Sequence, residues 1–132
     1  MAKENGLGMT VAVDVAAGGA AKDIENDLTN ISFDIPRAMW DVTGLDSSGP
    51  ERLHLLADFT VSLNGIFNDA ADKSHDVFKS IAGIRTVTIV HSGQTLAAEA
   101  LATGYNLTRA VGGELTWSTE MQNADGAVVA WA

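Results

Sequence analysis

The chain has 132 residues, no cysteine and a formal net charge of −9, because seventeen Asp and Glu outnumber eight Lys and Arg. This length suits one domain, and the lack of cysteine excludes disulfides, thiolate metal sites and thiol nucleophiles. The basic residues are scattered singly, which argues against tight nucleic-acid binding, because counterion release needs clustered positive charge.

Short runs in which β-branched residues alternate with polar ones predict a mainly β chain. The first run, 8–16, is followed by a small-residue linker, and the second run, 30–35, ends at Pro36. Proline donates no backbone hydrogen bond, so Pro36 is expected at a strand break or edge. The apolar positions of these two runs are Val11, Val13, Val15, Ile31, Phe33 and Ile35.

The next run, 38–43, places Ala38, Trp40 and Val42 on one face and opens into a polar loop at 44–51, which is expected to be exposed. The run 59–67 shows the clearest alternation. Its expected inward residues are Phe59, Val61, Leu63 and Phe67, and its expected outward residues are Thr60, Ser62 and Asn64.

The apolar period changes between residues 68 and 81, where Ser74, Val77, Phe78 and Ile81 fall three to four positions apart. Acidic residues come early in this segment and Lys79 comes late, an order that suits the helix dipole. The pattern predicts one short helix over 69–81, with its apolar stripe packed on a sheet.

From Ile84 onward, four strand-like runs separated by short turns predict a meander. Gly112-Gly113 and Asp125-Gly126 supply the positive φ values that tight hairpins need, so consecutive runs are expected to pair, including the last run, 127–132. The run 96–111 is long for one strand, and Gly104 is the expected position of a bulge or bend.

No catalytic constellation, cofactor motif or metal motif emerges, and an enzyme is not expected. The three histidines lie far apart in the sequence, without metal-site spacing, and no phosphate-binding glycine loop or nucleophile elbow is present. No apolar run approaches the roughly 20 residues of a membrane span, and the start lacks a signal-peptide pattern. We therefore expect a soluble chain made in the cytoplasm, with no membrane partner.

Two longer segments of the sequence resemble the major tail tube proteins of long-tailed, siphovirus-type bacteriophages. They are LTNISFDIPRAMWDVTGLDSSGPERLHLLADFTVSLNGIFND (28–69) and LAAEALATGYNLTRAVGGELTWSTEMQNADGAVVAW (96–131). The family pattern has a V-T-G-L segment, a strand ending in N-G-hydrophobic-F, a tyrosine-containing strand, a glycine turn, an E-L-T-W strand and a closing tryptophan. Trp40 and the AVGG turn depart from it.

The resemblance implies a β-sandwich or barrel-like tail-tube fold with one short flanking α-helix, as a single domain over 1–132 with an N-terminal arm at 1–10. It implies that six copies close into rings, and that the rings stack into a hollow tail tube through which phage DNA passes without specific binding. The implied partners are further copies, the tape measure, and the tail terminator and distal tail proteins. The implied location is the virion tail, after assembly in the host cytoplasm.

Two surfaces follow as candidates for this role. The expected lumen-facing residues are Glu114, Thr116, Ser118, Glu120 and Gln122, with Thr60, Ser62 and Asn64 as a second group. Contacts between rings are expected from the N-terminal arm and from the loop residues Leu45, Asp46, Ser47, Ser48, Glu51 and Arg52. Six copies of −9 give −54 per ring, and a lumen of that sign would repel DNA and let it slide.

Three alternatives stay open at this stage. The polar strand faces could be ordinary solvated faces of an isolated domain. The chain could be a tube subunit of a contractile or secretion system, which shares the ring architecture. It could also be a small β-sandwich binding module, although Trp40, Trp117 and Trp131 fall on apolar sides of their runs and are expected in the core.

Overall fold

The computed structural model describes residues 5–15 and 19–131, and it is built mainly from antiparallel strands. In chain order the strands are β1 (Thr10–Asp14), β2 (Ala21–Asp23), β3 (Leu28–Asp34), β4 (Arg37–Asp41), β5 (Arg52–Ala57), β6 (Thr60–Ile66), β7 (Arg85–His91), β8 (Gln94–Arg109) and β9 (Leu115–Asn123). A 3-10 turn, η1 (Glu25–Asp27), precedes β3, and one short α-helix, α1 (Ser74–Phe78), follows β6. The mainly β fold with one flanking helix is confirmed.

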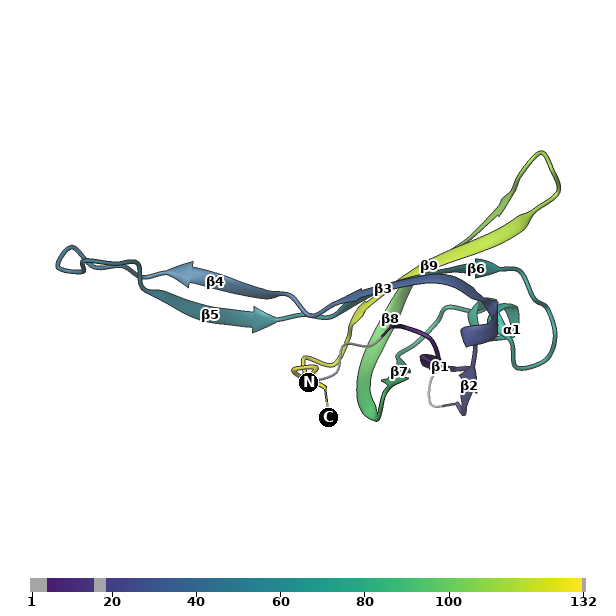
Figure 1. Cartoon of the computed structure of the whole chain (residues 1–132), viewed down its shortest axis with the longest axis horizontal. Helices are drawn as coiled ribbons and strands as arrows, with labels where there is room; N and C mark the ends of the chain where they lie inside the picture. Colours follow the sequence, from purple (N-terminus) through teal and green to yellow (C-terminus); the bar gives the residue numbers. More distant parts are fainter. Residues whose placement is uncertain (1–4, 16–18, 132) are drawn as a thin grey trace.

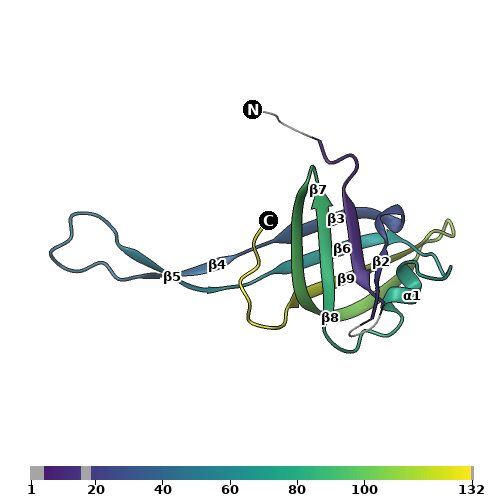
Figure 2. The same ribbon diagram turned by 90° about the horizontal axis from the view of Figure 1, so that it is seen from below.

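Seven strands form one sheet in the order β2-β1-β7-β8-β9-β6-β3, and β4 and β5 form a separate two-stranded sheet. Strand β8 belongs to two halves of the large sheet, because its first part pairs with β7 and its second part with β9. Figure 2 shows β1 and β7 crossing β3, β6 and β9, so the sheet folds over itself as two layers.

The core lies between these two layers. Val11 and Val13 of β1 and Val87 and Ile89 of β7 are buried from one side. The other layer contributes side chains to the same cluster, among them Val61, Leu63, Trp117 and Met121. The alternation expected in runs 8–16 and 59–67 therefore places valines and leucines in the core, where burying each such side chain contributes about 1.5–3 kcal/mol.

A β-bulge lets β8 serve both layers. Its register to β9 shifts between Ala102 and Gly104, which confirms the bulge expected at Gly104. Before the bulge, even-numbered residues such as Leu96 and Ala98 face the core, whereas after it Tyr105 packs against the core. An extra residue in one strand changes which side chains face inward and bends the strand, so one long strand turns the corner of the sandwich.

The helix is shorter than the sequence predicts. It covers Ser74–Phe78 within the expected 69–81, because Asn68 caps a turn at Ala70 and Asp72 adopts φ 65°. A left-handed residue cannot continue a right-handed helix. The buried carboxylate of Asp27 accepts the backbone N–H of Ser74 at 2.9 Å and so binds one of the free N–H groups at the helix start.

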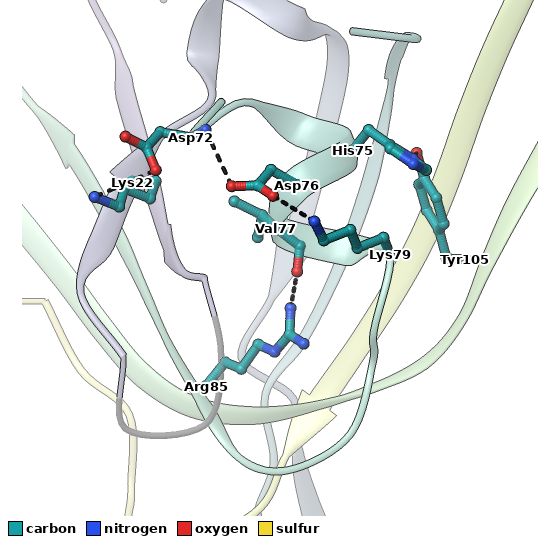
Figure 3. A network of polar contacts seen from close by, with 8 residues as sticks. All are labelled: Lys22, Asp72, His75, Asp76, Val77, Lys79, Arg85 and Tyr105. Carbon is teal, nitrogen blue, oxygen red and sulfur yellow. Dashed lines mark hydrogen bonds and ion pairs between the residues drawn. The ribbon is translucent and has the colours of Figure 1, made fainter. Parts of the chain in front are cut away.

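Polar contacts connect α1 and the turn before it to β7 and β2 (Figure 3). Arg85 is buried in β7 and donates a hydrogen bond to the carbonyl oxygen of Val77 in α1. Lys22 of β2 pairs with Asp72 at 3.5 Å, and Lys79 pairs with Asp76 at 2.7 Å. The hydrogen bond from Lys79 lowers the pKa of Asp76, and burial lowers the pKa of Arg85.

The end of the meander was predicted wrongly. β7, β8 and β9 pair consecutively as expected, but β9 then pairs with β6 rather than with the run after Asp125-Gly126. In the described part of that run, 127–131, the one β-bridge joins Leu96 and Trp131. Its residues are mostly exposed, but Val129 is buried in the core and the Trp131 ring lies 5.8 Å from that of Phe33.

Candidate functional site

Strands β6 and β9 bring the two predicted groups of lumen-facing residues together on one sheet face. The two strands are direct neighbours, with Ser62 opposite Glu120 and Asn64 opposite Ser118. Thr60 lies opposite Gln122, and Thr116 opposite Ile66. Side chains that are directly opposite share a face. Two runs that are far apart in the sequence therefore form one continuous surface, here called the polar face.

Glu114 is the one predicted member that lies outside this strand pair. β9 begins at Leu115, and Glu114 is in the turn before it, where its carbonyl oxygen accepts the N–H of Ala110 at 2.9 Å. Its side chain is exposed at the end of the polar face. Glu114 was predicted to occupy a lumen-facing position on a strand, but it lies in the turn before the strand.

Sequence reasoning missed two further strands of the polar face. On β3, Asn30, Ser32 and Asp34 lie opposite the polar residues of β6. On β8, Asn106 and Thr108 lie opposite Ser118 and Thr116. The alternation of Ser32 and Asp34 with apolar residues was a usable signal for β3. For β8 the bulge hid the signal, because it reverses the alternation midway.

The polar face carries carboxylates and no cation at its paired positions, all of which lie within the described ranges. Asp34 and Glu120 are exposed on it, and its other members are mainly Ser, Thr, Asn and Gln. A shallow polar hollow of about 370 Å³ lies beside the bulge, lined by Ser62, Asn64, Thr103, Gly104, Asn106, Ser118, Thr119 and Glu120. This composition suits contact with water and repulsion of other anions.

Two edges of the sheet that carries the polar face are open. β3 pairs only with β6, so its other edge has no strand partner within the described residues. β7 pairs with the Gln94–Ala100 part of β8, so in the described part of the chain Leu101–Arg109 pairs on one side alone, with β9. The strands β3, β6, β9 and the second half of β8 thus form a four-stranded unit open at both sides, and such edges are templates for pairing with another chain.

The loop at 44–51 is the tip of a long hairpin that projects from the body (Figure 1). Leu45, Asp46, Ser48 and Glu51 are exposed in the tip, and Ser47 is half-buried. Arg52 is the first residue of β5 and lies opposite Asp41. No strand was predicted over 52–57 (RLHLLA), although its first four residues alternate polar and apolar side chains.

Side-chain hydrogen bonds hold the tip of the hairpin in one conformation. Asp41 accepts the N–H of Thr43 at 3.0 Å and its hydroxyl at 2.6 Å. The Thr43 hydroxyl in turn accepts the N–H of Glu51 at 2.9 Å, and Ser47 donates to the Glu51 carboxylate at 2.9 Å. The bonds from Thr43 lower the pKa of Asp41. The loop is thus exposed and also internally ordered.

The tryptophans differ in burial, against the expectation that all three pack in the core. Trp117 is buried and donates its indole N–H to the carbonyl oxygen of Ile66 at 3.0 Å. Trp40 is 58% exposed on the hairpin, and Trp131 is 42% exposed. Trp40 falls at every second position with Ala38 and Val42, as a core residue would, but among the described residues no second layer covers the hairpin.

The three histidines lie on different elements: His54 is on β5, His75 on α1 and His91 at the end of β7. Over 5–15 and 19–131, no group of three or more His, Asp or Glu residues could hold a metal ion. In the same ranges no helix has the length and apolar content needed to cross a membrane. The predicted inter-ring arm at 1–9 lies partly outside the described residues, which begin at Asn5.

Solved structures share this fold across the whole chain. One is a chain in the virion of a native gene transfer agent particle, with a TM-score of 0.77 and 17% identity, covering 98% of this chain and 99% of that one. Another is in the tail of an empty gene transfer agent particle with C6 symmetry, with a TM-score of 0.73, 20% identity and the same coverage. No protein-family model matches the chain. No curated protein matches it either. The chain therefore has a fold that is also found in a phage-like particle tail.

Proposed function

We propose that this chain is a structural, non-enzymatic subunit of a phage-like tail tube, in which six copies close into a ring and rings stack into a hollow conduit. The observation that carries the proposal is the four-stranded unit with two open edges and one polar face. Closing it edge to edge, β3 of one copy beside the second half of β8 of the next, would give every backbone group on those edges a partner and make a continuous barrel.

The polar face would line the lumen of this barrel. The opposite side of β6 and β9 is buried against the other layer of the same subunit, so only the polar face is free to face a channel. With Asp34 and Glu120 from each copy, a ring of six would present twelve carboxylates. Their repulsion acts over about 8 Å at physiological ionic strength and would keep DNA from adhering to the wall.

The β4–β5 hairpin would provide contacts between rings. It projects away from the body along the long axis, and its tip residues Leu45, Asp46, Ser47, Ser48, Glu51 and Arg52 are the predicted contact set. The proposed setting is the tail of a siphovirus-type virion, assembled in the host cytoplasm with a tape measure, a tail terminator and a distal tail protein. A likeness to a C6-symmetric tail supports the ring of six.

Native mass spectrometry and negative-stain microscopy of the purified chain test the proposal. We expect species of six subunits and stacked rings whose length grows with protein concentration. A chain that remains a monomer at all concentrations would overturn the proposal and would favour a small binding module instead. A tube subunit of a contractile system would also form rings, and a sheath layer around its tubes in native particles would distinguish it.

A further inference from the structure

Exposed large apolar side chains gather at opposite ends of the molecule. Six of them lie on the β4–β5 hairpin: Met39, Trp40, Leu45, Leu53, Leu55 and Leu56. Three more lie where β6, β8 and β9 meet the β8–β9 turn: Ile66, Leu107 and Val111. Figure 1 shows the hairpin at one end of the longest axis and this turn at the other.

The hairpin has an apolar side and a more polar side. Trp40 lies opposite Leu53, and both are more than half exposed. The adjacent pairs, Asp41 with Arg52 and Met39 with His54, point to the other side because side chains alternate along a strand. A two-stranded sheet is marginally stable in water on its own, and an exposed apolar surface of this kind marks an interaction site.

The β8–β9 turn presents its apolar residue on a defined backbone. The N–H of Ala110 donates to the carbonyl oxygen of Glu114 at 2.9 Å, and the N–H of Gly113 donates to that of Ala110 at 2.9 Å. Gly113 adopts φ 98°, a conformation that glycine allows without strain. Val111, between these bonds, is fully exposed. The turn therefore holds an apolar side chain outward in a fixed place.

The chain path makes these two surfaces the two ends of one sheet. β3 leads into β4 and β5 leads into β6, so the hairpin extends one end of the four-stranded unit, whereas the β8–β9 turn closes the other end. In copies that stack with the same polarity, the hairpin end of one copy meets the turn end of the next. Such a head-to-tail contact uses two different surfaces and repeats without limit.

We propose that the Trp40 and Leu53 side of the hairpin docks on the β8–β9 turn, around Val111, of a copy in the adjacent ring. This inference rests on the proposed tube and names the receiving surface for its hairpin. Charges support the pairing in part, because Asp46 and Glu51 lie at the hairpin tip and Arg109 ends β8 beside the turn. Arg52 at the tip and Glu114 in the turn offset some of this attraction.

Cysteine cross-linking tests this pairing cleanly, because the chain has no cysteine of its own. The variants are Leu53→Cys and Val111→Cys, mixed in equal amounts, assembled and then treated with a short bismaleimide. We expect a cross-linked dimer from the mixture and a ladder of longer oligomers from the double variant. His54→Cys with Val111→Cys is the matched control, since His54 lies on the other side of the hairpin, and it should cross-link at least tenfold less.

Two results would overturn the inference. One is wild-type-like tubes that contain both cysteines and give no cross-link, which would leave the proposed tube intact while removing Val111 as the receptor. The other is equal cross-linking from His54→Cys. A second variant, Leu53→Glu, should form rings that do not stack into tubes. Adding Val111→Lys, so that the lysine of one copy meets the glutamate of the copy in the adjacent ring, should restore tubes. If the unmodified chain forms no rings, that result would instead contradict the proposed function itself.

Discussion

Gly65 of β6 lies directly opposite Trp117 of β9, and the indole ring occupies the space that a side chain at Gly65 would need. A Cβ at Gly65 would come 2.9 Å from two carbons of the Trp117 ring and would collide with the backbone carbonyl oxygen of Asp27. This close approach places Trp117 over the helix, with its ring 5.3 Å from that of Phe78. The contact therefore joins the sheet that carries the polar face to α1.

The substitution Gly65→Ala is expected to destabilise the fold by about 1–3 kcal/mol, the usual cost of overpacking a filled core. Urea denaturation of dilute, monomeric protein measures this cost as a lower midpoint. Gly104→Ala is the matched control, because nothing lies within 4 Å of a Cβ there, and its free energy of unfolding should stay within about 0.5 kcal/mol of the parent. Equal midpoints for the two variants would contradict the packing described.

A second prediction concerns the carboxylate of Asp27, which caps the start of α1. Asp27→Ala removes the acceptor for the Ser74 N–H and for the Asn68 amide, which donate at 2.9 and 3.0 Å. Because Asp27 is buried, the two donors would be left unsatisfied, at an expected cost of about 1–3 kcal/mol. Hydrogen exchange at Ser74 should accelerate more than exchange in β7. Unchanged exchange at Ser74 would show that the cap contributes nothing.

Tyr105 gives a pH prediction that needs no label, because it is the only tyrosine in the chain. Burial raises the pKa of Tyr105 above its usual value of about 10. The native protein should therefore form tyrosinate at higher pH than the urea-unfolded chain, as followed by ultraviolet absorbance. The neutral phenol is favoured in the folded state, so its contribution to stability is full below pH 10 and is lost as pH rises through the folded pKa. Coincident titration curves would contradict this burial.

The charge of the proposed lumen leads to a fourth prediction. Tubes assembled from Glu120→Lys should bind short duplex DNA in a nuclease-resistant form at low salt, and should release it as salt is raised. The control is Asp23→Lys, which makes the same charge change at an exposed position on β2, outside the polar face. Nuclease-resistant DNA in the control, or none in Glu120→Lys tubes, would remove Glu120 from the lumen.

The hairpin tip leads to a fifth prediction. Deleting Ser47–Pro50 should leave a folded subunit, because these residues lie in the projecting tip and away from the core. The deletion removes the bond from Ser47 to Glu51 and shortens the surface that reaches the next ring. We expect rings without tubes in micrographs, with an unchanged circular dichroism spectrum. Tubes of normal length would exclude the tip from the contact between rings.

Much of the fold could be predicted from local patterns. Alternation over 59–67 and 114–122 placed Val61, Leu63 and Trp117 inward, and the glycine at 104 indicated the bulge. These signals are local because a strand exposes every second residue to one side. The two polar groups on β6 and β9 were therefore identified separately, residue by residue, before their adjacency was known.

The remaining features depend on contacts between distant segments. Nothing near β9 in sequence indicates that it pairs with β6, more than fifty residues earlier. Trp40 alternates like a core residue, yet no second layer covers its hairpin within the residues that the structure describes. The helix begins later than predicted because Asp72, just before it, takes a left-handed conformation that the neighbouring sequence does not indicate. In each case the structure depends on which distant segment of the chain packs or pairs with the residues concerned.

Cryo-electron microscopy of tubes assembled from the unmodified chain tests the central proposal most directly. We expect six copies per ring, β3 of each copy beside the second half of β8 of the next, and Ser62, Asn64 and Glu120 facing the channel. Rings in which this polar face points outward, or preparations that contain only monomers, would contradict it.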